Sequence, residues 1–164
     1  MKIIVDAMGG DNAPQEIVAG ALAAVKARPE LEMILVGREA EVRAAAGGAL
    51  PGRVSVVNAT EVIDMHDDPA KAFRSKPDSS ITVGLTMLRD GQGDAFVSAG
   101  STGALFSAAT LIVKRIRGIR RAAMAPLVPT AGRGVVLVDC GATADCTVEY
   151  LLQFAYLGSF YAAR

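Results

Sequence analysis

The fold is decided by MKIIVDAMGGDNAP, residues 1–14 of the chain. Ile3 to Val5 is a short apolar run typical of a buried strand, and two adjacent glycines then mark a turn. Pro14 can begin a helix, because the first turn does not use the N–H group that proline lacks. One apolar face follows it, at Ile17, Ala21, Leu22 and Val25. The stretch therefore predicts a strand, a glycine-rich turn and a helix in succession.

The same alternation continues along the chain. We predict further strands at Glu32–Val36, Val54–Val57, Ala95–Ser98, Met124–Val128 and Val135–Val138. We predict helices at Glu39–Ala46 and Pro69–Arg74, from a Ser79 or Ser80 cap to Arg89, at Ala104–Ile116 and at Val148–Ala163. Met124–Val128 is predicted at an edge because prolines flank or interrupt it, and Val135–Val138 as a central strand. Such alternation favours parallel strands with crossover helices, in a single α/β domain spanning residues 1–164.

Composition narrows the function classes. Seventeen basic residues balance seventeen acidic ones, so no net field recruits nucleic acid or an anionic membrane. Hydrophobic residues make up 51% of the chain, enough for a core, and no Trp is present. Cys140 and Cys146 stand alone, with one distant His, which fits neither a zinc pattern nor a disulfide framework. We expect ordinary small thiols in a reducing cytoplasm and no metal.

No targeting or spanning segment is expected. Met1 leads directly into the first strand, without the charged and then apolar stretch of a signal peptide. The most apolar interior run, residues 104–113, ends at Lys114-Arg115 and is shorter than the roughly 20 residues that a bilayer span needs.

In open parallel sheets, ligands bind beyond the carboxyl ends of the strands, which selects three turns. In the first, Gly9 and Gly10 allow successive N–H groups to converge on an oxyanion, and the following helix adds its positive end. Asp6 and Asp11 would repel a phosphate unless a cation or a basic partner intervenes. The alternative is a tight turn in which both carboxylates accept backbone hydrogen bonds.

The second turn is Gly100-Ser101-Thr102-Gly103, between a strand and a helix. Its free N–H donors could hold phosphate or stabilise a developing oxyanion, which suits acyl or phosphoryl transfer. The alternative is a simple Ser/Thr helix cap. A phosphate-binding loop of the nucleoside triphosphatase kind is not expected, because its Gly-Lys-Ser/Thr ending is missing, and the dinucleotide fingerprint fails at both turns.

The third turn runs from Asp139 to Cys146. Asp139 could orient a substrate or another side chain, and Asp145 or Thr147 is a candidate cap for the last helix. Either aspartate could equally be structural. Most sides of the last helix are apolar, so we expect it to pack against further protein or a second subunit.

Charged residues between the third and fourth strands offer two more candidates. His66, the only histidine, could act as a general base or lie exposed on a loop. Lys71, Arg74 and Lys76 could meet a phosphate or an acidic carrier protein, or could form a solvated helix face.

Islands of sequence spread over the whole chain carry a resemblance to a known family. Besides residues 1–14 and Val97–Leu105, they are Glu61–Met65, Pro69–Ala72, Asp78–Ser80, Gly93–Ala95, Asp145-Cys146, Leu151–Ala155 and Gly158-Ser159. Together they resemble the N-terminal half of the bacterial phosphate acyltransferase (PlsX) family.

The resemblance implies a three-layer αβα sandwich with a mostly parallel sheet, similar to the isopropylmalate-dehydrogenase-like and phosphotransacetylase folds. It also implies attack of inorganic phosphate on a long-chain acyl-[acyl-carrier-protein], giving acyl phosphate for phospholipid synthesis. No metal or organic cofactor is implied, and members are cytoplasmic homodimers that associate peripherally with the membrane. We assign phosphate or oxyanion binding to Gly9, Gly10, Gly100, Ser101, Thr102 and Gly103, and orienting roles to Asp6, Asn12, Ser98 and Asp139.

Some positions depart from the family pattern. We would expect Asn at Ser101 and Thr143 and no histidine at 66, and the sequence stops at Arg164, about where the family's first half ends. If these residues were the whole polypeptide, we would expect incomplete activity. Two alternatives stay open: an acyl-coenzyme-A-dependent enzyme of the phosphotransacetylase kind, and an inactive half-protein that binds phosphate, carrier protein or a membrane surface. A nucleotide-dependent dehydrogenase is a distant third.

Overall fold

The computed structural model describes residues 1–163 of the chain. Its contacts divide into two compact units, residues 1–114 and residues 115 onward, and each is described by itself. The prediction of one domain across residues 1–164 stays a prediction.

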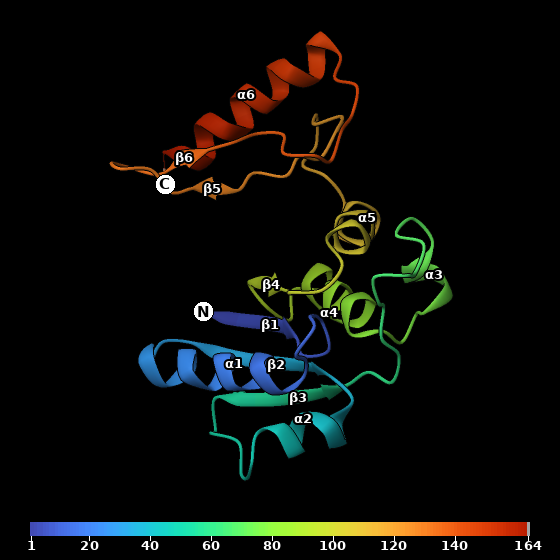
Figure 1. Ribbon diagram of the computed structural model, residues 1–164, viewed down its shortest axis with the longest axis vertical. Coiled ribbons are helices and arrows are strands. Elements are labelled where there is room, and N and C mark those ends of the chain that lie inside the picture. Colours follow the sequence, from blue (N-terminus) through green and yellow to red (C-terminus); the bar gives the residue numbers. More distant parts are fainter. Residues whose placement is uncertain (164) are drawn as a thin grey trace. The chain divides into compact units, whose positions relative to one another are not determined.

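The first unit is built on a four-stranded parallel sheet with the order β3-β2-β1-β4 (Figure 1). Its strands are β1 (Lys2–Asp6), β2 (Glu32–Gly37), β3 (Val54–Asn58) and β4 (Ala95–Val97). Val5 of β1 stands in register with Leu35 on one side and with Val97 on the other. Because β1 and β4 are parallel neighbours, the loops that follow them leave the sheet at the same edge.

Helices cover both faces of this sheet (Figure 1). On one face, α1 (Gln15–Ala27) and α2 (Glu39–Ala45) bury a cluster that includes Val18, Leu35 and Val42. On the other face, Met87 of α4 (Ser80–Arg89) packs with Ile4, Ile34 and Val36, which alternate with the residues of the first cluster. The predicted three-layer α/β fold with a parallel sheet is confirmed.

Two further helices pack against α4 or close to it. They are α5 (Thr102–Ile112), which contacts α4, and the short α3 (Ala72–Ser75), which contacts α5. The helix predicted at Pro69–Arg74 is observed as α3, which begins at Ala72 and ends at Ser75.

Serine side chains cap the N-terminal ends of α4 and α5. Ser79 accepts a hydrogen bond from Thr82 N over 3.3 Å, and Ser101 accepts one from Ala104 N over 3.4 Å. As a result α5 begins at Thr102, two residues before the predicted start. It also ends at Ile112, because Lys114 adopts φ 74°, so the predicted end at Ile116 was wrong.

The second unit contains β5 (Leu127–Val128), β6 (Val135–Val136) and α6 (Val148–Ala162). The strands form a two-stranded antiparallel ladder, in which Leu127 pairs with Val136. The predicted central strand at Val135–Val138 is therefore wrong, since within residues 115–163 β6 pairs with β5 alone. The continuous apolar run resembled a strand buried on both sides, but here β6 has one neighbour and Val135 is 55% exposed.

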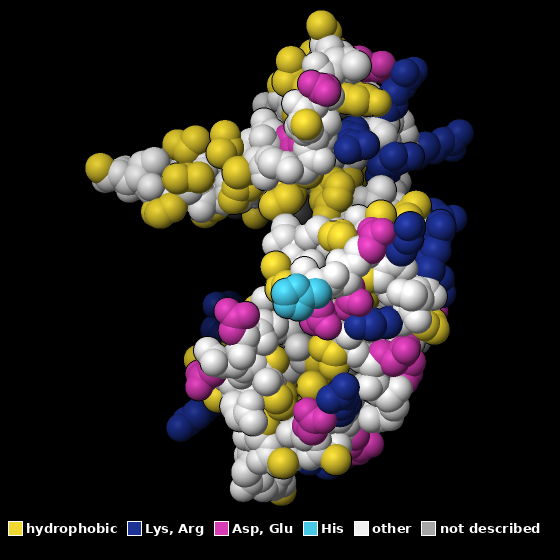
Figure 2. Space-filling model, turned by 45° about the vertical axis from the view of Figure 1, so that its right-hand side comes forward, with side chains coloured by type: hydrophobic (Ala, Val, Ile, Leu, Met, Phe, Trp, Pro, Cys, Tyr) yellow, Lys and Arg dark blue, Asp and Glu magenta, His cyan; other side chains and the backbone are white. Residues whose placement is uncertain are grey.

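Large apolar side chains lie exposed over much of the second unit (Figure 2). Among residues 115–163 only Phe154 is buried, and Thr147 caps α6 by accepting a hydrogen bond from Tyr150 N. The exposed set is Ile116, Leu127, Val128, Val135, Leu137, Val148, Leu151, Leu152, Tyr156, Phe160 and Tyr161. The expectation of an apolar last helix is confirmed, and what covers it stays open. No helix within residues 1–163 has both the length and the hydropathy of a membrane span.

Candidate active site

The loops that follow β1 and β4 are joined by side-chain hydrogen bonds. Ser98 Oγ donates to Asp6 Oδ2 over 2.6 Å and accepts from Gly100 N over 3.1 Å. Asp6 is 1% exposed, and its Oδ1 accepts from Met8 N over 3.1 Å. Asp6 and Ser98 thus hold both loops in fixed positions, and the predicted tight turn around the Asp6 carboxylate is part of this arrangement.

The backbones of the two loops touch at a pair of glycines. A Cβ placed on Gly9 would overlap Asp6 Oδ2 and lie 2.8 Å from Gly100 N and 2.9 Å from Ser98 Oγ. A Cβ on Gly100 would lie 3.2 Å from the Cα of Gly9. Gly10 has φ 116°, which side chains rarely tolerate. Glycine is therefore needed at these positions for steric reasons, whichever ligand the loops bind.

Free amide donors follow both glycines of this contact in the sequence. The N–H groups of Gly10, Thr102 and Gly103 are on exposed residues and donate to no acceptor within residues 1–163. Thr102 and Gly103 begin α5, whose N-terminal end carries a partial positive charge. The Ser/Thr cap considered as an alternative also exists, since Ser101 is the N-cap of α5. A cap and an anion site are compatible, because the cap uses only the N–H of Ala104.

A pocket of about 210 Å³ opens next to these loops. Its mostly apolar wall carries two carboxylates, Asp11 and Asp64, and no lysine or arginine lines it. Residues of three loops form it: Met8, Gly10 and Asp11; Val62, Ile63, Asp64 and Met65; and Ala99, Gly100 and Ser101. No group of three or more His, Cys, Asp or Glu side chains within residues 1–163 is placed to hold a metal.

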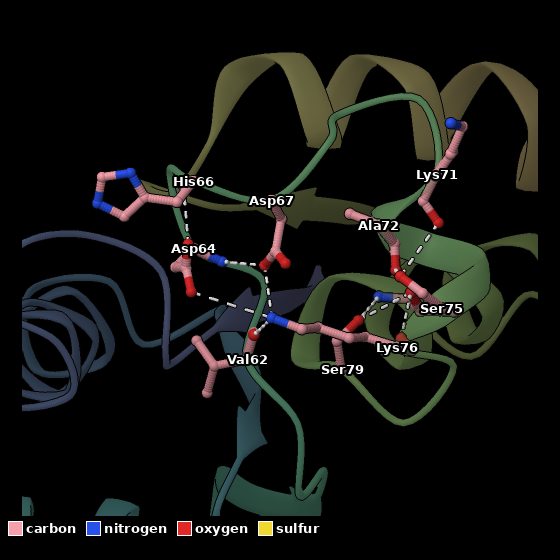
Figure 3. Close-up of polar contacts among 10 residues, drawn as sticks. Val62, Asp64, His66, Asp67, Lys71, Ala72, Ser75, Lys76 and Ser79 are labelled. Atoms are coloured by element: carbon pink, nitrogen blue, oxygen red, sulfur yellow. Dashed lines mark hydrogen bonds and ion pairs between the residues drawn. The ribbon is translucent and has the colours of Figure 1, made fainter.

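The Lys76 side chain extends into the loop from Val62 to Asp67, where its ammonium also lies 4.0 Å from Asp64 Oδ2 (Figure 3). Lys76 Nζ donates to Val62 O over 2.8 Å and to Asp67 Oδ2 over 2.5 Å. Asp64 N also donates to Asp67 Oδ2, over 2.9 Å. The Lys76 ammonium, and secondarily the Asp64 amide, hold the pKa of Asp67 below its ordinary value.

The other predicted orienting groups lie apart from Asp6 and Ser98. Asn12 is exposed on the turn before α1, where only its backbone carbonyl is engaged, by Glu16 N. Asp139 belongs to the second unit; its Oδ1 accepts from Met124 N over 2.9 Å, while its buried Oδ2 has no partner within residues 1–163. Their catalytic roles stay predictions.

The remaining charged candidates are mostly engaged with neighbours. Lys71 is 80% exposed and 3.4 Å from Asp68, and the Arg74 guanidinium lies 5.3 Å from the centroid of the Phe73 ring. Lys76 is tied to the Val62–Asp67 loop, so it is the least free of the three to contact a carrier protein. His66 is exposed, and its ring points away from the Lys76 contacts (Figure 3).

Sequence reasoning missed the contacts that fix this loop. Thr60 N and Thr60 Oγ1 both donate to Asp78 Oδ2, and Asp78 N donates to Glu61 Oε2 over 2.8 Å. The Thr60 hydroxyl and amide lower the pKa of Asp78. The only signal was a cluster of charged residues on both sides of a short helix, which does not say which of them pair.

The fold belongs to the class of α/β proteins represented by phosphotransacetylases. A solved phosphotransacetylase from Streptococcus pyogenes superposes with a TM-score of 0.70 and 26% identity, over 94% of this chain and 51% of that one. The chain itself belongs to the fatty acid synthesis protein family, whose model matches residues 1–164.

Curated relatives carry the name phosphate acyltransferase. Those from Pelotomaculum thermopropionicum and Herpetosiphon aurantiacus are 48% and 47% identical over the whole of this chain. The chain spans about half the length of these relatives, 48% and 45% respectively. The resemblance seen in the sequence, and the expected half-length match, are confirmed.

Proposed function

We propose that this chain supplies the first half of an enzyme that transfers a long-chain acyl group from acyl-[acyl-carrier-protein] to inorganic phosphate. The products are acyl phosphate and the free carrier-protein thiol. The observation that carries the proposal is the contact between Gly9 and Gly100, which places the exposed amide donors of two loops at one edge of the sheet. The names of the relatives and the likeness to a phosphotransacetylase support acyl transfer that involves phosphate.

The proposed chemistry asks for positioning rather than for a covalent intermediate. An oxygen of phosphate attacks the thioester carbonyl carbon, and the thiolate then departs, so one C–O bond forms and one C–S bond breaks. Phosphate is already a nucleophile, and the developing charge is on the carbonyl oxygen. The free N–H groups of Gly10, Thr102 and Gly103 are suited to that charge or to the phosphate itself.

Asp6 and Ser98 act in this proposal as positioning residues. Asp6 is buried and accepts a hydrogen bond from Ser98 Oγ. Ser98 Oγ in turn accepts a hydrogen bond from Gly100 N, so the two residues together fix the backbone of the second loop. Both side chains are engaged within the loops, since the Asp6 carboxylate accepts from Met8 N and Ser98 Oγ, and Ser98 Oγ accepts from Gly100 N. Ser101 and the Asn12 and Asp139 side chains remain proposed contributors.

A second candidate is a half-protein that binds phosphate or carrier protein without turnover. It is favoured by the free amides of Gly10, Thr102 and Gly103, which can bind an anion without catalysing its transfer. An enzyme that uses acyl-coenzyme A is favoured only by the phosphotransacetylase likeness. The proposal also includes dimer formation, a cytoplasmic location and peripheral membrane association. It further includes carrier-protein contacts at Lys71, Arg74 and Lys76.

The test is a turnover assay with palmitoyl-[acyl-carrier-protein] and inorganic phosphate, in which hydroxylamine traps acyl phosphate. It is run on the chain and on the same residues joined to the second half of the Pelotomaculum relative. Turnover by either protein supports the acyl transfer, and turnover only by the fusion places essential groups in the second half. A preference for palmitoyl-coenzyme A supports the phosphotransacetylase-like alternative. Phosphate-independent or absent thioester loss in both proteins contradicts the proposal.

A further inference from the structure

The electrostatics of the pocket beside the glycine contact are unsuited to phosphate. Asp11 and Asp64 line it, and no basic side chain lines it. Lys76 Nζ lies 4.0 Å from Asp64 Oδ2 and offsets part of that charge, but Asp11 forms no salt bridge within residues 1–163 and would still repel a dianion. The free amides of Thr102 and Gly103 do not line the pocket, so an anion has a better place at the start of α5.

The walls of the same pocket are suited to an apolar group. Met8 and Ile63 are 9% and 4% exposed and form a fixed floor, while Met65 is 72% exposed at the rim. Val62 directly precedes Ile63 in the sequence and is partly buried against the core cluster of the first face. Methionine side chains adapt to apolar ligands of varying shape.

The wall of the pocket is held in place before any ligand binds. Lys76 fixes the Val62 carbonyl and Asp67, and Thr60 and Glu61 are tied to Asp78 at the base of the loop. Glu61 also forms a parallel β-bridge with Ser79. A loop fixed at both ends costs little ordering on binding, which favours a preformed site over an adaptable surface.

We infer that this pocket takes the part of the acyl chain next to the thioester, with the carbonyl directed toward the Gly10 and Gly100 backbones. This inference rests on the proposed acyl transfer and names which substrate part goes where. The uncharged chain lies between Val62 and Met65, and the phosphate approaches from the start of α5. Lys76 is then a positioning residue for the acyl site.

The test measures how binding depends on chain length. Saturated acyl-pantetheine thioesters with 4 to 12 carbons are titrated calorimetrically into the chain. Each methylene that enters the pocket should tighten binding about fourfold until the pocket is full. Met65→Asp adds a third carboxylate at the exposed rim and should abolish this dependence without disturbing the core. Val62→Phe fills the pocket and should weaken binding of the longer chains about tenfold.

A matched control separates the pocket from other apolar surfaces of the chain. Leu111→Asp makes the same kind of change on α5, where the leucine is 51% exposed, and should leave the dependence intact. The inference is overturned if binding does not depend on chain length, or if all variants keep the same dependence. If the chain or the fusion turns over thioester but Met65→Asp keeps the same dependence of binding on chain length, the acyl pocket is rejected and the proposed function stands. If Met65→Asp loses the dependence of binding on chain length but neither the chain nor the fusion turns over thioester, the acyl pocket stands and the proposed acyl transfer is rejected.

Discussion

Ser98 donates its hydroxyl proton to the buried Asp6 carboxylate over 2.6 Å, although the two residues are 92 positions apart in the chain. Each stands at the carboxyl end of its strand, and β1 and β4 are parallel neighbours. The hydrogen bond joins the two glycine-rich loops into one structure. Because Ser98 Oγ also accepts from Gly100 N, a change at Asp6 is transmitted to the backbone of the second loop.

Ser98→Ala should destabilise the chain and disorder the second loop. The substitution leaves the buried Asp6 Oδ2 without its donor, which costs about 1–3 kcal/mol. Urea unfolding measures the loss, and Ser107→Ala, at a half-buried position on α5, should stay within about 0.5 kcal/mol. In the turnover assay we expect a larger loss than stability alone explains. Equal stability of both variants would show that the Asp6–Ser98 hydrogen bond contributes nothing.

Gly9→Ala should destabilise the glycine contact. Its Cβ would lie 2.8 Å from Gly100 N, a backbone atom that cannot move aside cheaply. We expect a loss of about 1–3 kcal/mol in the free energy of unfolding. Gly20→Ala is the control, because nothing lies within 4 Å of that Cβ on α1, and it should gain about 0.5–1 kcal/mol. A neutral Gly9→Ala would mean that the loops are farther apart in solution.

Lys76→Met should change how the chain responds to acid. In the native chain Lys76 holds the pKa of Asp67 down, so its stabilising effect is present above the unfolded pKa of Asp67. It is lost as the pH falls through the lowered folded pKa. The variant should lose this part of the pH dependence, and its Asp67 pKa should rise toward the ordinary value. Carboxyl carbon NMR titration and urea unfolding across pH 2–6 measure both.

Lys71→Met is the matched control for that titration. Lys71 is exposed and contacts Asp68 rather than Asp67, so the Asp67 pKa should not change. If Lys71→Met raises the Asp67 pKa as much as Lys76→Met does, the effect comes from net charge and not from the hydrogen bond.

Phe154→Ala should unfold the second unit locally. Phe154 is 2% exposed and is the one buried side chain among residues 115–163. Removing such a ring costs about 3–5 kcal/mol. Hydrogen exchange of the α6 amides should accelerate, while the amides of β1 and β2 keep their protection. Phe160→Ala, at a position that is 75% exposed, should leave exchange nearly unchanged. Equal exchange in both variants would contradict the packing of α6.

Local signals predicted the elements well where side chains near in sequence decide them. The alternation of apolar runs predicted all four strands of the parallel sheet, and the helix caps Ser79 and Thr147 were each one of two predicted alternatives. Errors arose where neighbours decide the outcome. The Val135–Val138 run looked like a central strand, but strand burial depends on what packs beside it, and β6 pairs only with β5 within residues 115–163.

The sequence by itself determined the family, the parallel α/β class and the glycine-rich turns, because these depend on residue type and spacing. Only the tertiary structure decided that Asp6 and Ser98 pair and that Lys76 holds the Val62–Asp67 loop. Those contacts depend on the order β3-β2-β1-β4, which brings β4 next to β1. Strand order results from how the faces of the helices bury together, and no local pattern carries that information.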